Sequence, residues 1–312
     1  MKKIIRIQQP DTAPMHLTWM INNICTNQCS YCPPNLHEGK NHHYEWENAQ
    51  RFFKMLFERY PRIHCSVSGG EPSLSPFFPD ICKTFYDAGH TIGLTSNAAK
   101  PARYWKEIAP YLNYISFSWH PEFPDKNFLE KVVSAARQIP VTVRIMMLPN
   151  KWNECIEVFN EFSKHWEFIT EPVRIMPYND IDPLSSVYTE EQIEWFNNNN
   201  GNHRELNHLI KMAPVQILAN YHFDDGTVLF EPNASDWVNR GYTNFNGYTC
   251  EIGIKSLFVR PNGVIYAGNC LVGGIIGNIN KPEKIKWPTG PSKCNLDLCS
   301  CSSDVNLNKW ID

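Results

Sequence analysis

The sequence predicts an α/β fold in which short strands alternate with helices, and three observations lead to this prediction. Short apolar runs recur between residues 17 and 176, several of them end in polar or glycine-containing segments, and amphipathic helical patterns separate them. Such alternation is typical of a parallel sheet with right-handed crossovers, either a partial barrel or an open doubly wound sheet. Functional side chains are then expected where the carboxyl ends of the strands meet.

The individual elements follow from the apolar spacing and from residues that start or stop helices. The predicted strands span residues 17–21, 63–67, 91–94, 114–117, 141–147 and 173–176. The predicted helices lie at residues 44–60, between a cap at Ser75 and a stop at Gly89, at residues 102–108, after a cap at Asp125, and after Pro149. Each of these helices connects two strands of the predicted sheet.

The chain length sets the domain organisation. A chain of 312 residues allows one large domain, or one of about 200 residues with a smaller one, and 42% hydrophobic residues suffice for a core. We expect a core over residues 1–180, a connector with a helix and loops over residues 181–249, and a second region over residues 250–312. In the connector, Thr189 and Gln192 form a capping box that opens a helix, and residues 221–248 read as loops and short hairpins.

Charge and hydropathy restrict the possible partners. The net charge of −3 gives no basis for binding nucleic acid or a membrane surface. No apolar run is long enough to span a bilayer, and the basic start of the chain lacks the apolar region and cleavage site of a signal peptide. We therefore expect a cytoplasmic protein that binds neither nucleic acid nor membrane.

The eleven cysteines are distributed unevenly. In a reducing compartment, grouped cysteines are better explained by metal binding than by disulfides. Cys65, Cys82 and Cys155 stand alone within apolar segments, so we expect them to be small buried hydrophobic residues. The other eight form an early group before residue 33 and a late group after residue 249.

The early group has the spacing CxxxCxxC and follows the first predicted strand. Thiolates of Cys25, Cys29 and Cys32 can hold three irons of a 4Fe–4S cubane and leave the fourth iron open for a ligand. The alternative is a zinc site, which needs a fourth ligand, and His37, His42 or His43 could supply it.

A second motif, Gly69-Gly70-Glu71-Pro72, ends the second predicted strand. The two glycines let the backbone approach a ligand closely, and their carbonyl groups with the Glu71 carboxylate can accept hydrogen bonds from a cationic amine. The alternative is an ordinary Gly-Gly turn.

Together these two motifs, with Tyr31 directly before the last cysteine, resemble the signature of the radical S-adenosylmethionine (radical SAM) enzymes. The resemblance implies a partial (β/α)6 barrel, a 4Fe–4S cluster whose open iron binds S-adenosylmethionine, and an electron donor such as flavodoxin or ferredoxin. It further implies reductive cleavage to a 5′-deoxyadenosyl radical, which takes a hydrogen atom from the substrate.

The same resemblance suggests further contacts to S-adenosylmethionine, each of which could instead be structural. Ser96, Asn97 and Ser118 end predicted strands where the family contacts ribose or the methionine carboxylate. Arg144 could bind that carboxylate bidentately, with Arg174 as the competitor. The residues expected against adenine are Ile175, Met176 and Tyr178, and the candidates for proton handling beyond the fourth strand are His120 and Glu122.

The late cysteines indicate a second metal site. Residues 255–260 and 264–267 predict a hairpin around an Asn-Gly turn, and the whole group comprises Cys250, Cys270, Cys294, Cys299 and Cys301. The group resembles the auxiliary-cluster domains called SPASM or twitch, which implies a second 4Fe–4S cluster. A structural zinc site is the alternative. Which four of the five cysteines would be ligands stays open.

The substrate is the least constrained part. We expect a small polar metabolite or sugar that is oxidised or, with a cysteine such as Cys294 returning a hydrogen atom, epimerised. Modification of a ribosomally made peptide is the alternative; such enzymes often carry a leader-binding domain, and only some fifteen residues precede the first predicted strand. An alternative of another class is an iron–sulfur electron carrier or a SAM-binding regulator.

Overall fold

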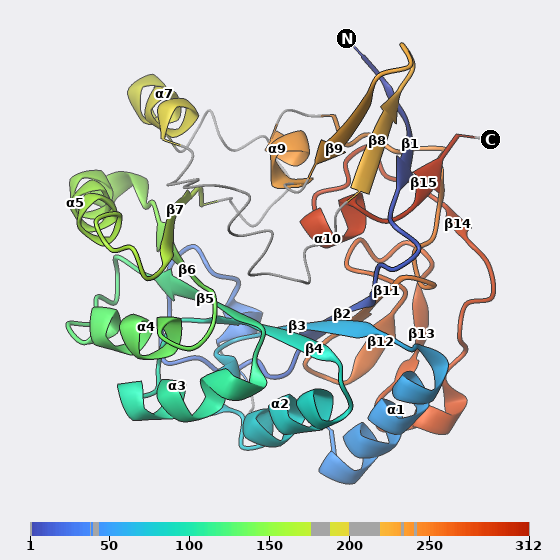
Figure 1. Cartoon of the computed structure of the whole chain (residues 1–312), viewed down its shortest axis with the longest axis horizontal. Coiled ribbons are helices and arrows are strands. Elements are labelled where there is room, and N and C mark those ends of the chain that lie inside the picture. Colours follow the sequence, from blue (N-terminus) through green and yellow to red (C-terminus); the bar gives the residue numbers. More distant parts are fainter. Residues whose placement is uncertain are drawn as a thin grey trace.

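The computed structural model describes residues 2–37, 39, 44–175, 188–199, 219–231, 234–239 and 242–311. These residues form two sheets. Figure 1 shows the larger sheet across the middle of the molecule, with helices along its outer side, and the smaller sheet beside both chain termini.

The larger sheet contains nine strands. They are β2 (Met15–Met20), β3 (Ile63–Ser68), β4 (Thr91–Ser96), β5 (Tyr114–Trp119), β6 (Val141–Met146), β7 (Ile169–Val173), β11 (Ser256–Val259), β12 (Val264–Tyr266) and β13 (Ile275–Asn278). From β2 to β7 the strands are parallel neighbours in chain order, as the α/β partial-barrel prediction requires. Beyond β2 the sheet continues with β11, which is parallel to β2, and then with antiparallel β12 and β13.

Helices cover the outer face of the parallel strands (Figure 1). They are α1 (Trp46–Arg59), α2 (Phe78–Asp87), α3 (Ala102–Ile108), α4 (Phe128–Ala136) and α5 (Trp152–Phe162). Alternate strand residues such as Leu17 and Trp19 are fully buried against these helices, whereas the residues between them face the inner side of the sheet. Cys65, Cys82 and Cys155 are fully buried in this core, as predicted.

The structure differs from the sequence prediction at three helix or strand ends. Ser75 does not cap α2, because residues 72–74 form a 3-10 turn and the helix begins only at Phe78. Helix α4 likewise begins at Phe128, after a turn in which the Asp125 carboxylate accepts from the Asn127 N–H. The last parallel strand ends at Val173, where the sequence placed its start. Gly89, with φ +74°, ends α2 as predicted.

The smaller sheet joins the two ends of the chain. Its strands are β1 (Ile4–Gln8), β8 (Ala219–Phe223), β9 (Val228–Glu231), β10 (Thr249–Cys250), β14 (Ser292–Lys293) and β15 (Lys309–Trp310), in the order β14-β10-β15-β1-β8-β9. The N-terminal β1 pairs with β8 and with the C-terminal β15. Two short helices, α9 (Ala234–Asn239) and α10 (Ser302–Val305), lie near this sheet. Helix α7 (Glu190–Asn198) instead packs against α5, where the Phe196 ring contacts the Trp152 ring.

Each sheet therefore contains strands from both the first and the last of the regions expected from the sequence. Residues 4–8 belong to the smaller sheet, whereas the predicted hairpin, now β11 and β12, extends the larger one. The Thr189 capping box and the turn at Gly263, with φ +78°, form as predicted. The remaining short 3-10 turns span Pro34–Leu36, Ala109–Tyr111, Pro149–Lys151 and Pro282–Lys284.

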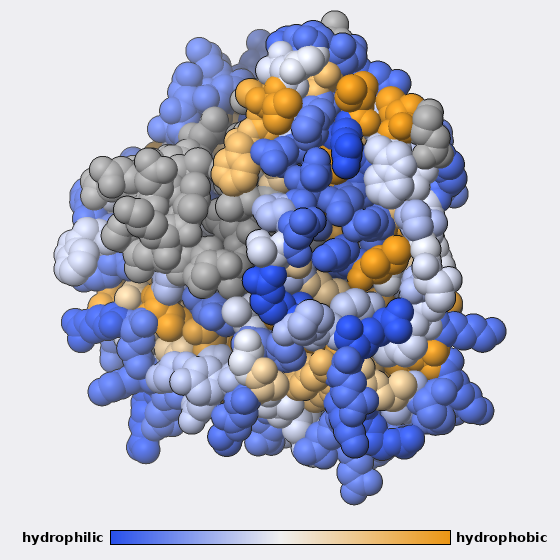
Figure 2. Space-filling view, turned by 45° about the vertical axis from the view of Figure 1, so that its right-hand side comes forward, coloured by the Kyte–Doolittle hydropathy of each residue, from blue (hydrophilic) through white to orange (hydrophobic). Residues whose placement is uncertain are grey.

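The molecular surface is mostly hydrophilic in the view of Figure 2, with apolar groups near its top. At the edge of the smaller sheet, Val228, Leu229 and Phe230 of β9 are between 44% and 54% exposed. Among the described residues, no helix is both long and apolar enough to cross a bilayer.

Candidate functional site

The predicted site residues gather where the parallel strands end. The cysteine loop, residues 25–32, follows β2, and residues 69–71 follow β3. Asn97 comes directly after β4, and His120 directly after β5. Because the carboxyl ends of parallel neighbours lie at one edge of the sheet, these segments meet there, and hydrogen bonds connect them.

The glycine turn packs against the chain that enters the cysteine loop. A Cβ atom would lie 2.5 Å from the Asn22 carbonyl oxygen if placed on Gly69, which has φ +140°, and 2.2 Å from the Ile24 carbonyl oxygen if placed on Gly70. Those two carbonyls accept hydrogen bonds from the N–H groups of Gly70 (3.1 Å) and Glu71 (2.7 Å). We expected the two glycines to let the backbone approach a ligand. In this structure they let it approach the backbone of residues 22 and 24 instead.

The Glu71 side chain is fully buried and links β3 to the end of β4. Its Oε1 accepts from the Ser73 N–H (2.9 Å) and the Ser96 hydroxyl (2.8 Å), and its Oε2 accepts from the Asn97 N–H (2.7 Å). Burial raises the pKa of this carboxyl, and the hydrogen bonds from Ser73, Asn97 and Ser96 oppose that rise. Glu71 thus fixes the backbone of Asn97.

Asn97 in turn contacts the first cysteine. Its Nδ2 donates to Cys25 Sγ (3.4 Å) and to the Thr26 hydroxyl (3.1 Å), and the Asn27 N–H also donates to Cys25 Sγ (3.4 Å). Two N–H donors aimed at one sulfur favour its thiolate form and are the kind of outer contact that orients metal ligands.

The loop after β5 holds the middle of the cysteine loop. His120 Nδ1 lies 2.8 Å from the Tyr31 hydroxyl and 3.4 Å from Cys29 Sγ, and the His120 and Tyr31 rings are stacked. Burial lowers the pKa of His120 to about 4, and nearby Glu122 opposes this. Both carboxylate oxygens of Glu122 accept from Ser30, one from its N–H (2.8 Å) and one from its hydroxyl (2.6 Å).

The three thiols of the loop suit a cubane cluster. All are free, Cys29 is buried, and Cys25 and Cys32 are partly buried. Burial raises the pKa of each thiol, and that of Cys29 to about 11, so metal binding must displace their protons. Within the described residues, no three His, Cys, Asp or Glu side chains are placed to hold a single metal ion. A cubane differs because each thiolate binds a different iron.

The remaining predicted contacts are divided between two faces. Ser118 and Arg144 are cross-strand partners on the inner face, and Arg144 Nε lies 3.7 Å from Glu171 Oε2. Arg174 points toward α7, where it donates to the Asn197 side chain and covers the Phe196 ring. Arg144 is therefore the better placed of the two for a ligand at the strand ends. Met176 and Tyr178, like His42 and His43, lie outside the described residues.

The late cysteines meet in a second place, through segments distant in sequence. Cys250 pairs with Lys309 across β10 and β15, and the Cys270 N–H donates to the Asp304 carboxylate (2.8 Å) of α10, which Cys301 precedes. The pKa of Cys299 rises to about 12 through burial, and also through nearby Asp304, Cys250 and Cys301.

The fifth late cysteine lies close to this group as well. Cys294 acts electrostatically on Cys250 and shares the smaller sheet's core with Cys299, and its thiol donates to the Leu296 carbonyl (3.9 Å). Lys309 and Asp304, like Ser30 in the early site, were missed by sequence reasoning, because no motif marks a buried charge or a loop serine.

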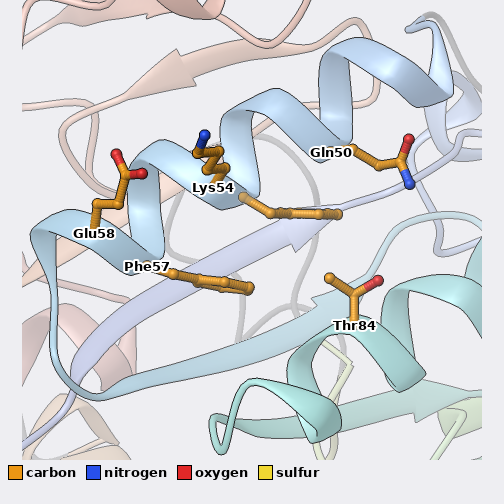
Figure 3. Close-up of a pocket in the computed structure, with 6 residues that line it drawn as sticks. Gln50, Lys54, Phe57, Glu58 and Thr84 are labelled. Atoms are coloured by element: carbon orange, nitrogen blue, oxygen red, sulfur yellow. The ribbon is translucent and has the colours of Figure 1, made fainter.

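A surface hollow of about 500 Å³ lies elsewhere, between α1 and α2 (Figure 3). Figure 3 shows the Phe57 ring between the two helices, with Lys54 and Glu58 on α1 and Thr84 on α2; Phe53 also lines the hollow. It belongs to the helix-covered outer side of the sheet, so it is not part of the site at the strand ends.

Comparisons with known proteins agree with this fold. Residues 19–162 match the family model of the Radical SAM superfamily. The fold is similar to that of anSMEcpe with bound AdoMet and Kp18Cys peptide, at 15% identity and a TM-score of 0.51, covering 85% of this chain and 77% of that one. It is also similar to Streptococcus suis SuiB bound to precursor peptide SuiA, at 12% identity and a TM-score of 0.53, covering 89% and 65%. A search of curated protein sequences finds no match.

Proposed function

We propose, on the premise that residues 19–162 match the Radical SAM superfamily, an enzyme that cleaves S-adenosylmethionine reductively and removes a hydrogen atom from a small polar substrate. When bound, the 4Fe–4S cluster and S-adenosylmethionine supply the 5′-deoxyadenosyl radical. The protein's own residues hold these groups, orient them and keep water away.

Each group at the strand ends has a distinct part in this proposal. Cys25, Cys29 and Cys32 bind three irons, and the amide of Asn97 orients the Cys25 sulfur. Because the Glu71 carboxylate is already bound by three donors, we propose that it positions Asn97, and that the carbonyl groups of the glycine turn accept the methionine ammonium. Ser118 and Arg144 remain our candidates for the ribose and the carboxylate.

The inner face of the sheet is the observation that favours a polar substrate. Alternation places Ser66 and Ser116 on this face, because their neighbours Cys65, Val67 and Ile115 are buried under the helices. Ser116 is only 5% exposed, and its hydroxyl has no hydrogen-bond partner among the described residues. A buried, unpaired hydroxyl costs free energy that a hydroxyl-rich or otherwise polar ligand would recover. The other inner hydroxyls are Thr18, Ser68, Thr95 and Thr142.

Peptide modification is the second candidate. It is favoured by the two similar structures, which are described as complexes with a Kp18Cys peptide and with the precursor peptide SuiA. An extended peptide would need its backbone groups satisfied in the same space, which the inner hydroxyls could also do.

The test is 5′-deoxyadenosine formation by the anaerobically reconstituted protein with S-adenosylmethionine and a strong reductant. Cell extract is added in three forms: untreated, restricted to small molecules, and treated with protease. Acceleration by the small-molecule fraction that survives protease supports a polar metabolite, whereas acceleration lost after protease supports a peptide. No product under any condition would contradict radical chemistry and favour an electron carrier or a SAM-binding regulator.

We further propose that the late cysteines hold an auxiliary 4Fe–4S cluster through Cys250, Cys270, Cys299 and Cys301. Support comes from the electrostatic contacts that link these four thiols. Cys294 also lies near Cys250, and the proposal leaves it out because its thiol donates to the Leu296 carbonyl. Such a cluster could accept an electron from the substrate and give oxidation. If instead Cys294 returns a hydrogen atom, reaction in D2O should place deuterium in an epimerised product, and its absence from the product would favour oxidation.

A further inference from the structure

Two charged side chains beside the late cysteines are almost completely removed from water. Lys309 is 2% exposed and Asp304 is 1% exposed. Charged residues are rarely buried this deeply without a partner, because removing an ion from water is unfavourable. Neither residue has a part in the chemistry proposed at the strand ends.

Lys309 is fixed in one position by several contacts. Its Nζ donates to the backbone carbonyls of Asp304, Val305 (3.0 Å) and Leu307 (3.5 Å), which close the end of α10. The same nitrogen lies 5.3 Å from the centre of the Phe245 ring. Carbonyl oxygens and a ring face together form an environment that suits an ammonium group. Lys309 is also the cross-strand neighbour of Cys250.

Asp304 occupies the other side of the group. Its carboxylate accepts from the Cys270 N–H (2.8 Å) and from Asn269 Nδ2 (3.4 Å). Its backbone N–H donates to the Cys301 carbonyl (3.0 Å), so Asp304 is bonded to two cysteine segments, to one through its backbone and to the other through its carboxylate. The late cysteines therefore have one buried positive group and one buried negative group beside them, and both charges act electrostatically on Cys250 and on Cys299.

We propose that Lys309 and Asp304 set the reduction potential of the auxiliary cluster, Lys309 raising it and Asp304 lowering it. Reduction adds one negative charge to the cluster, and a nearby cation stabilises that charge while a nearby anion opposes it. Both effects are strong where water is excluded, and net charge and solvent exposure are known to set the potentials of iron–sulfur clusters. This inference depends on the auxiliary cluster proposed above.

The test uses the full chain with Cys25, Cys29 and Cys32 replaced by alanine, so that only the auxiliary cluster gives a signal. Its midpoint potential is measured by a redox titration followed by electron paramagnetic resonance. We expect Lys309→Met to lower the potential and Asp304→Asn to raise it; the amide introduced by the second substitution would keep an oxygen for the Cys270 N–H. Lys286→Met, which removes an exposed charge, should leave the potential unchanged.

Shifts of opposite sign distinguish an effect of charge from a loosened structure, because a loosened structure would shift the midpoint potential of both variants in the same direction. Shifts of the same sign, or no shift in either variant, would overturn the inference. If Lys309→Met fails to take up a cluster, the sign of the Asp304→Asn shift decides alone. If the parent protein binds no cluster and the intact chain binds only about four irons, the auxiliary cluster itself is refuted, a result distinct from a measured potential that does not shift. If the intact chain binds about eight irons, the titration is carried out on the intact chain instead.

Discussion

The two cysteine sites of this molecule are built in opposite ways. In the early site, three thiols lie within residues 25–32 of one loop, and neighbouring strand ends fix that loop through Asn97, His120 and Glu122. In the late site, Cys250, Cys270 and the last two cysteines come from segments that only the folded chain brings together. A contiguous site can be recognised from its spacing, whereas a dispersed one shows only the number of possible ligands.

The groups that surround the cysteines also differ between the two sites. The early site lies at the open edge of the sheet, where Cys25 receives neutral N–H donors and Cys32 is partly exposed. The late site contains the buried charges of Asp304 and Lys309. In both sites two of the proposed ligands are partly exposed, so the sites differ in these charged neighbours and not in the exposure of their thiols.

The largest expected effect comes from removing the early thiols. Replacing Cys25, Cys29 and Cys32 by alanine should abolish 5′-deoxyadenosine formation, because no ligand of the reactive cluster remains. If the two sites are independent, iron content should fall from about eight to about four per chain, since each cubane holds four irons. Iron analysis and activity of the same preparations check this.

A second variant, which removes late cysteines instead of the early ones, tests the late site in the same way. Cys299→Ala with Cys301→Ala should remove the late iron and leave the early iron in place. Loss of all iron in either variant would contradict two independent sites and would indicate that one site is needed to fold the other.

The next effect concerns Glu71, which joins the early site to the sheet. Glu71→Gln keeps the shape of the side chain but replaces one carboxylate oxygen by an NH2 group, which cannot accept the hydrogen bonds that this oxygen accepts now. We therefore expect the free energy of unfolding to fall by about 3 kcal/mol. Urea unfolding of the metal-free protein measures it, with Glu58→Gln on the exposed side of α1 as the control. A loss as small as the control's would show that Glu71 does not fix the strand ends.

Sequence reasoning predicted the parallel sheet, and the residues it selected for the early site do lie together in the structure, for a physical reason. The alternation of strands with helices and the CxxxCxxC and Gly-Gly-Glu-Pro motifs are local patterns, and the parallel topology places their strand ends together. What it could not predict depends on tertiary contacts. The partners of Glu122, the backbone that fills the space beside Gly69, and the pairing of β11 with β2 appear only in the fold.

Acid should weaken the half of the molecule that carries the early site. Burial lowers the pKa of His16 on β2 from 6.5 to about 4, and that of His64 on β3 well below 6.5. Between pH 6.5 and about pH 4 the unfolded chain binds more protons at His16 than the folded chain does. The stability that is present above pH 6.5 is therefore lost as the pH falls toward 4. His16 alone accounts for about 2 kcal/mol at about pH 5.

Unfolding free energies of the metal-free protein at about pH 7 and about pH 5 check this. His16→Gln should show a smaller decrease between the two conditions, because glutamine does not titrate. An equal decrease in the variant would assign the acid sensitivity to other groups.

The smallest expected effect concerns Glu122, and it distinguishes a residue that holds the cysteine loop in place from one that transfers protons in the reaction. Glu122→Gln keeps one acceptor for Ser30 and weakens two partly exposed hydrogen bonds, so we expect less than about tenfold loss of 5′-deoxyadenosine formation, which corresponds to about 1 kcal/mol. Glu130→Gln, an exposed carboxylate on α4, should have no effect. If Glu122→Gln were instead as inactive as the variant without the early cysteines, Glu122 would have to take part in the chemistry itself. The loop after β5 would then be part of the reaction site, and the early site would depend on two segments of the chain, which would make it less different from the late one.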